Sequence, residues 1–134
     1  MTMEELTVTA AIIEKDGKYL ITQRPDDGRS NAGRWEFPGG TVEPDEDLEG
    51  NLKKEMFEEA GMNVKVGDRF EKSAHVYGKT RHVELVAFHC KYVSGDIQKK
   101  DILDFAWVTP QEMDKYDITE ADLPFVEKLK TLEK

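Results

Sequence analysis

Three glutamates close together in the first half of the chain are the residues best suited to chemistry. Glu55, Glu58 and Glu59 stand just before Gly61, in a segment whose apolar residues recur every four positions as in a helix. Helical spacing places Glu55 beside both other glutamates, where like charges repel each other. The partial negative charge at the C-terminal end of a helix adds to that repulsion. Because Mg²⁺ takes oxygen ligands and bridges carboxylates to phosphates, the cluster predicts a magnesium site.

The helix that would carry these glutamates has recognisable ends. Pro44 and Asp45 suit its beginning, with Asp45 as the N-cap and Glu46 in the first turn. Gly61 suits a left-handed C-terminal cap. Gly50 is unfavourable within a helix, and we expect it to mark a close approach to neighbouring backbone. One apolar stripe should face the core: Leu48, Leu52, Met56 and Ala60, with Phe57 beside it.

The remaining segments predict strands before and after this helix, and a second helix at the end of the chain. Residues 16–17 and 78–80 are hairpin turns by composition, and Cys90 is a small buried side chain. Residues 109–112 look like the start of a short helix, and residues 119–122 resemble a capping box before a C-terminal helix with Leu123, Val126 and Leu129 inward. The strand candidates are residues 8–13, 19–22, 64–66, 71–77, 81–92 and 104–109. This order predicts an α+β domain in which helices cover a mixed sheet.

Length and composition limit the classes of protein that fit. A chain of 134 residues makes one domain, residues 1–134. The net charge of −9 argues against binding of a nucleic acid polymer or a membrane surface, because both need basic patches. A single cysteine forms no internal disulfide, which fits a reducing compartment. The acidic N-terminal segment resembles neither a signal peptide nor a membrane span, so we expect a soluble, cytoplasmic protein.

The glutamate cluster resembles the signature of the Nudix hydrolases, Gly-x5-Glu-x7-Arg-Glu-U-x-Glu-Glu-x-Gly-U, where U is apolar. The corresponding residues here are Gly40, Glu46, Lys54, Glu55, Met56, Glu58, Glu59, Gly61 and Met62. So many matched positions are specific, whereas a solvated acidic helix face would not require them. The segments EFPGG, QRP and ADLP also resemble MutT-type members, so the likeness covers most of the chain.

The resemblance implies a fold, a reaction and a set of metal ligands. The fold is an α/β/α sandwich, with a curved mixed sheet between the helix of the signature and a C-terminal helix. The reaction is hydrolysis of a nucleoside diphosphate linked to another group. Mg²⁺, with Mn²⁺ as a substitute, would be held by Glu55, Glu58, Glu59 and the Gly39 carbonyl. One of the glutamates or a loop carboxylate would take the proton from water. Asp101 is the expected loop carboxylate, with Asp96 and Asp104 nearby.

Lys54 is the one departure from the signature. In the family, an arginine here forms a salt bridge that orients carboxylates of the loop and helix. Lysine keeps the charge but lacks the planar fork that binds both oxygens of a carboxylate. We therefore expect a less rigid site, and Lys54→Arg should raise the catalytic rate or leave it unchanged.

Recognition of the substrate rests on fewer residues, each with a structural alternative. By resemblance Arg24 contacts the nucleotide, although an ordinary surface arginine fits equally well. Asp122 would meet the base and, as a carboxylate, accept from an amino group such as cytosine N4; its alternative is a capping box with Thr119. Other candidates are aromatic residues that stack on a base or lie in the core, and cations that meet phosphates or stay solvated: Trp35, Phe37, Tyr77, Lys79 and Arg81.

Together these features predict a Mg²⁺-dependent nucleoside triphosphate pyrophosphohydrolase of the MutT type. It would act on a modified nucleotide, such as an 8-oxo-dGTP-like or modified CTP substrate, and so remove it from the nucleotide pool. Hydrolysis of a dinucleoside polyphosphate is an alternative, because Tyr77 resembles a marker of that group. A non-catalytic nucleotide-binding module is another. The partner is a small nucleotide, and the protein is a monomer or a homodimer.

Overall fold

The computed structural model describes residues 4–26, 28, 31–78 and 80–132. Its strands form one mixed sheet in the order β3-β2-β1-β5-β4, with β6 paired to β2. β1 and β5 are parallel, and the other strand pairs are antiparallel. The strands are β1 (Glu4–Lys15), β2 (Lys18–Gln23), β3 (Trp35–Glu36), β4 (Asn63–Tyr77), β5 (Arg81–Ser94) and β6 (Asp104–Val108). The helices are α1 (Leu48–Ala60) and α2 (Leu123–Leu132), with short 3₁₀ turns η1 (Glu112–Lys115) and η2 (Glu120–Asp122).

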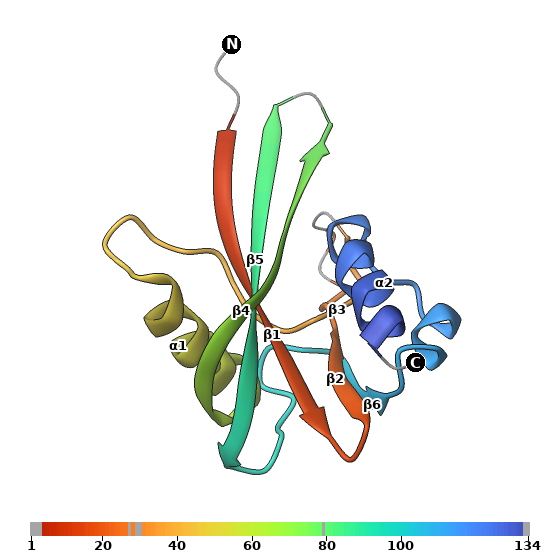
Figure 1. Cartoon of the computed structure of the whole chain (residues 1–134). Coiled ribbons are helices and arrows are strands. Elements are labelled where there is room, and N and C mark those ends of the chain that lie inside the picture. Colours follow the sequence, from red (N-terminus) through yellow and green to blue (C-terminus); the bar gives the residue numbers. More distant parts are fainter. Residues whose placement is uncertain (1–3, 27, 29–30, 79, 133–134) are drawn as a thin grey trace.

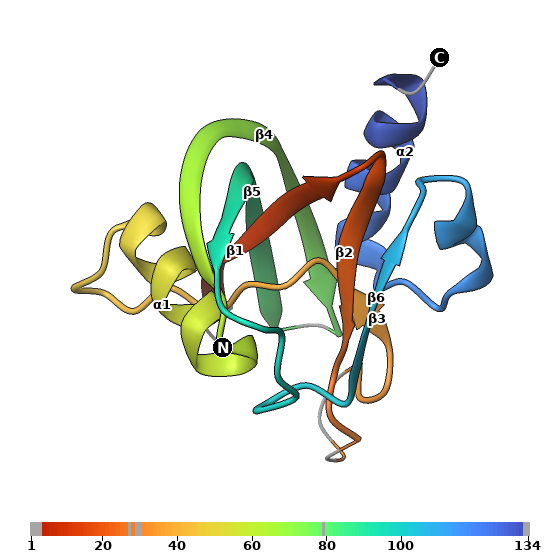
Figure 2. The ribbon, with the colours of Figure 1, turned by 90° about the horizontal axis from the view of Figure 1, so that it is seen from below.

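The helices α1 and α2 lie on opposite sides of the strands (Figures 1 and 2), and each packs in its own hydrophobic core. Successive residues of a strand point to opposite faces, so β1 contributes to both cores. Ala10 and Ile12 pack in the core that contains α2, whereas Ala11 and Ile13 pack in the core that contains α1. The predicted sandwich of a curved mixed sheet between two helices is confirmed.

The ends of α1 differ in part from the prediction. The N-cap is Asp47 rather than Asp45, and its side chain accepts a hydrogen bond from the backbone N of Gly50 at 2.7 Å. Glu46 therefore precedes the helix. A side chain at Gly50 would overlap that capping carboxylate, so the close contact is with Asp47 and not with neighbouring backbone. Gly61 forms the expected left-handed cap, with φ of 68°.

Two residues expected in the core are exposed. Phe57 is 52% exposed and Leu123 is 43% exposed. Phe57 lies next to Met56 in sequence, and a step of one residue turns it 100° away from the buried stripe of α1. In α2, Phe125 is fully buried instead, together with the predicted Val126 and Leu129.

The turns mostly follow their composition. Asp16 and Gly17 both have positive φ, 53° and 79°, as a two-residue hairpin requires. The predicted capping box at Thr119 is wrong, because that side chain makes no capping hydrogen bond. Cys90 is buried, as expected. Within the part of the chain that the structure describes, no helix is both long and apolar enough to span a membrane.

Candidate active site

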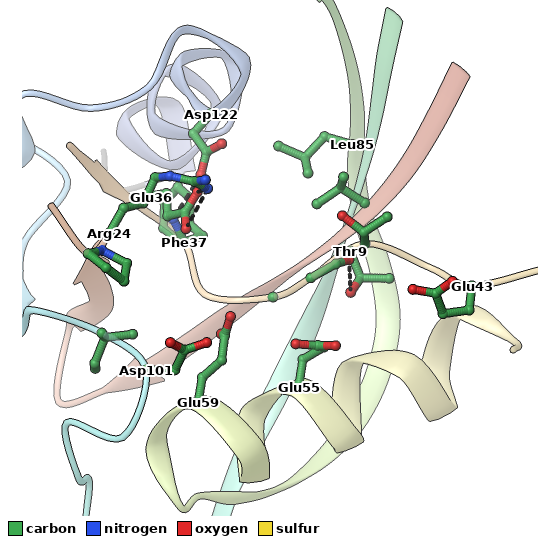
Figure 3. A pocket seen from close by; sticks show the side chains of 16 residues that line it. Thr9, Arg24, Glu36, Phe37, Glu43, Glu55, Glu59, Leu85, Asp101 and Asp122 are labelled. Atoms are coloured by element: carbon green, nitrogen blue, oxygen red, sulfur yellow. Dashed lines mark hydrogen bonds and ion pairs between the residues drawn. The ribbon is translucent and has the colours of Figure 1, made fainter. Parts of the chain in front are cut away.

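A cavity of about 390 Å³ opens between α1, the middle of β1 and the loop that follows β3. Figure 3 shows acidic side chains from α1 and the loop before β6 at one end of it, and a polar group around Arg24 at the other. Its acidic lining residues are Glu36, Glu43, Glu55, Glu59, Asp101 and Asp122. Two groups of residues therefore share one cavity: carboxylates at one end, and a partly buried polar group beside Phe37 at the other.

At the first end, the structure brings Asp101 together with Glu55 and Glu59. The backbone N of Asp101 donates to the Glu59 carbonyl oxygen at 3.0 Å, which fixes the loop to the last turn of α1. Asp104 is held elsewhere, since it pairs with Lys99 at 3.2 Å, and Asp96 does not line the cavity. Of the three aspartates considered for the loop carboxylate, Asp101 is the one that lines the cavity with Glu55 and Glu59.

Burial and mutual repulsion make these carboxyl groups costly to ionise together. Burial raises the pKa of Glu59 to about 9, and nearby Glu36, Glu55 and Asp101 contribute further. Burial also raises the pKa of Glu55, followed by the neighbouring charge of Glu58. A positive charge placed among them would favour the ionised form of both glutamates and so lower both pKa values. The donors are all oxygens, as Mg²⁺ prefers, so the residues fit such an ion.

Glu58 behaves differently from the other two glutamates. It is exposed and does not line the cavity. Among the residues placed by the structure, no three acidic, histidine or cysteine side chains form a complete metal-binding group. Glu55, Glu59 and Asp101 thus lie near one another but do not surround a single position, and Glu58 lies outside this group.

Glycines 39 and 40 leave room for this arrangement. A side chain at Gly39 would overlap the Thr9 carbonyl of β1, so the two backbones are in close contact there. A side chain at Gly40 would overlap the Glu55 carboxyl group. Both glycines line the cavity, so the Gly39 backbone borders the same space as Glu55.

The other end of the cavity is a partly buried polar group. Arg24 pairs with Glu36 at 3.2 Å, and its Nε is buried with no hydrogen-bond partner among the residues described. Asp122 accepts from the Phe37 backbone N at 2.8 Å and from Thr119 Oγ1 at 3.0 Å. Figure 3 shows both pairs side by side. Arg24, Phe37 and Asp122 are separate sequence candidates for substrate contact. The structure brings them to one end of the cavity together with Glu36, which has no predicted role.

Burial changes what Asp122 can do. It raises the pKa of Asp122 to about 8, and the nearby Glu36 carboxylate raises it further, against the hydrogen bond from Phe37. Near neutral pH the group can therefore donate a proton to a hydrogen bond as well as accept one. The sequence predicted an acceptor alone.

The remaining candidates lie farther from the carboxylates. Arg81 pairs with Glu4 at 3.0 Å and borders a second, smaller cavity of about 140 Å³ together with Tyr77. This cavity continues from the first, since the two share lining residues that include Asp122. Trp35 instead packs edge-on against Tyr116, with ring centroids 4.9 Å apart. Lys79 lies outside the described residues.

Comparison with known proteins agrees with this geometry. The family model of the NUDIX domain matches residues 8–128. The CTP pyrophosphohydrolase of Escherichia coli K12 is 38% identical, over 97% of this chain and 95% of that protein. The nucleoside triphosphatase NudI of Salmonella agona is 32% identical, over 89% and 92%.

Solved structures agree as well. The solution structure of the E. coli ORF135 protein has a TM-score of 0.82 and 36% identity, over 98% of this chain and 92% of that one. The MutT protein of Methanosarcina mazei has a TM-score of 0.88 and 25% identity, over 100% and 99%.

The chain therefore belongs to the Nudix family, and it is a Nudix hydrolase of the MutT-like group.

Proposed function

We propose that this protein is a Mg²⁺-dependent pyrophosphohydrolase that converts a nucleoside triphosphate to the monophosphate and pyrophosphate. The observation that carries the proposal is the division of one cavity into two ends. Glu55, Glu59 and Asp101 stand at the end suited to phosphates, and Asp122, Glu36 and Phe37 at the end suited to a base.

The phosphate end supplies acceptors for a cation and for a proton. Glu55, Glu59, Asp101 and the Gly39 carbonyl would hold Mg²⁺, with Glu58 joining them by a change of side-chain rotamer. The ion supplies positive charge to the diphosphate and increases the acidity of water. A carboxylate of this group takes the proton that the attacking water releases.

The base end fits a base with an amino group beside a ring acceptor, and we assign cytosine to it. The buried Asp122 and the half-buried Glu36 together can accept from an exocyclic amino group and donate to a ring acceptor, as cytosine and adenine both present. The 38% identity to a CTP pyrophosphohydrolase supports the same substrate. A modified CTP or dCTP is the substrate that we propose, with removal of such nucleotides from the pool as the role. In a cell, we expect this role to be cytoplasmic.

A nucleotide panel tests this proposal. The purified protein is incubated with CTP, dCTP, modified dCTP, 8-oxo-dGTP and a dinucleoside polyphosphate, with Mg²⁺, with Mn²⁺, or with EDTA. We expect the monophosphate and pyrophosphate in equal amounts, the highest kcat/KM with a cytosine nucleotide, and no turnover in EDTA.

Other outcomes have clear meanings. Release of orthophosphate in place of pyrophosphate would contradict the proposed reaction. Preferred cleavage of the dinucleoside polyphosphate would favour the alternative in which the second cavity, beside Tyr77 and Arg81, receives part of a larger substrate. Binding of nucleotides without turnover in either metal would indicate a non-catalytic module.

A further inference from the structure

The carboxylate of Glu46, just before α1, has hydrogen-bond partners on both oxygens. Oε1 accepts from Asn51 Nδ2 at 3.2 Å and from the backbone N of Glu43 at 2.9 Å. Oε2 accepts from Lys54 Nζ. Asn51 and Lys54 are three residues apart in α1 and so lie on the same face of the helix. Two side chains of one helix therefore hold one carboxylate, one on each oxygen.

Asn51 is polar and yet has no exposed surface. Its Oδ1 accepts from Thr9 Oγ1 at 2.6 Å, and its Nδ2 also donates to the Thr41 carbonyl oxygen at 2.9 Å. Buried amides are retained in proteins when their hydrogen bonds are satisfied, as they are here. The side chain thus joins three parts of the molecule: β1, the loop of residues 41–47, and α1.

Lys54 alone cannot do what an arginine does at this position. An arginine presents a planar fork that reaches both oxygens of a carboxylate, whereas a lysine is a single point charge. Lys54 reaches Oε2, and the Asn51 amide reaches Oε1. We propose that Asn51 and Lys54 together form a split clamp on Glu46, which does the work of one arginine and holds the loop of residues 41–47 on α1.

The split clamp is connected to the carboxylates through Gly40. The Thr9 backbone N donates to the Gly40 carbonyl oxygen at 2.9 Å, and the Thr9 hydroxyl, bound to Asn51, lies 3.4 Å from the same oxygen. The Glu55 carboxyl group packs directly against Gly40. A shift of the loop would move the backbone that positions Glu55. Asn51 is therefore a positioning residue; its effect on turnover rests on the proposed function, but its effect on stability does not.

A double-mutant cycle of Asn51→Ala and Lys54→Arg tests the split clamp. Turnover is measured with Mg²⁺, and the midpoint of thermal unfolding is measured separately in EDTA. We expect Asn51→Ala to lower kcat by about tenfold and to lower the midpoint, because residues in one network are coupled by effects of this size. Lys54→Arg alone should change kcat little. In the double variant, the arginine fork reaches both oxygens of Glu46. We therefore expect most of the lost kcat and most of the lost thermal stability to be restored.

Thr9→Val is the matched control. It removes the hydroxyl on the far side of Asn51 without removing a donor to Glu46, so its effect should add to that of Lys54→Arg with no rescue. If Asn51→Ala does not unfold cooperatively, Asn51→Ser replaces it in the cycle, because a serine hydroxyl is too short to reach Glu46.

The two readouts separate this inference from the proposed function. Additive effects of Asn51→Ala and Lys54→Arg on unfolding in EDTA would overturn the split clamp, whatever the protein hydrolyses. Coupling in the unfolding cycle, with no turnover of any nucleotide by the wild type, would support the split clamp and overturn the proposed function.

Discussion

At the scale of single residues, the surroundings of each carboxyl group decide its chemistry. Glu46 and Glu59 are chemically identical side chains in one signature. The hydrogen bond from Lys54, followed by those from Glu43 and Asn51, lowers the pKa of Glu46 to about 2. Burial and neighbouring acids raise the pKa of Glu59 to about 9. The first group is fixed as an anion that holds the loop, whereas the second becomes a stable anion only beside a positive charge.

Asp122 gives a prediction about stability and pH. Its pKa is about 8 in the folded protein and about 3.9 in an unfolded chain, so the folded state binds more protons between these values. The contribution of Asp122 to the free energy of unfolding is fully present below about pH 4 and is lost as the pH rises through about 8. Asn does not ionise, so we expect Asp122→Asn to lack this decrease in unfolding free energy. The variant should therefore gain stability relative to the wild type from pH 5 to pH 8.

Urea unfolding at a series of pH values measures this difference. The control is Asp68→Asn, at an exposed position of β4, which should follow the wild-type curve. A constant difference in unfolding free energy between Asp122→Asn and the wild type across the pH range would show that Asp122 is ionised in the folded protein.

At the scale of elements, Arg34 connects the loop before β3 to the segment that carries Asp122. Its side chain donates to Asn31 Oδ1 at 3.0 Å, Glu120 Oε2 at 2.7 Å and the Ile118 carbonyl at 2.7 Å. It also pairs with Asp117 at 3.2 Å. The backbones of β3 and this segment are paired at Trp35 and Ile118. Arg34 thus holds together the two segments that form the base end of the cavity.

We therefore expect Arg34→Ala to raise KM about tenfold and to change kcat less than about threefold. The physical reason is that Arg34 holds the base end in place, and contacts with the base are the same in the bound substrate and in the transition state. Loss of such contacts raises KM and leaves kcat nearly unchanged. Lys72→Ala is the control, since its ion pair with Glu84 joins β4 to β5 and neither residue lines either cavity. Steady-state kinetics with the preferred nucleotide make the comparison. A large fall in kcat with unchanged KM would show that Arg34 acts on the phosphate end instead.

At the scale of the whole molecule, the sequence predicted the fold class, both main helices and every strand except the two-residue β3, because periodicity and turn residues act locally. It missed features that depend on distant contacts. The exact N-cap depends on which aspartate reaches Gly50, and the exposure of Leu123 depends on how α2 meets the sheet. Glu36 carried no local signal for its role, since its ion pair with Arg24 and its place beside Asp122 arise only when β2, β3 and η2 assemble.

The central claim is that the acidic end of the cavity performs a metal-dependent hydrolysis. Its most direct test compares pyrophosphate release by the wild type, Glu59→Gln and Glu49→Gln across a Mg²⁺ titration. Glu49 is an exposed glutamate in the first turn of the same helix, so its variant controls for the loss of one negative charge. We predict that Glu59→Gln lowers kcat by about a hundredfold or more, whereas Glu49→Gln matches the wild type at every Mg²⁺ concentration. Equal turnover by Glu59→Gln and the wild type would contradict the claim.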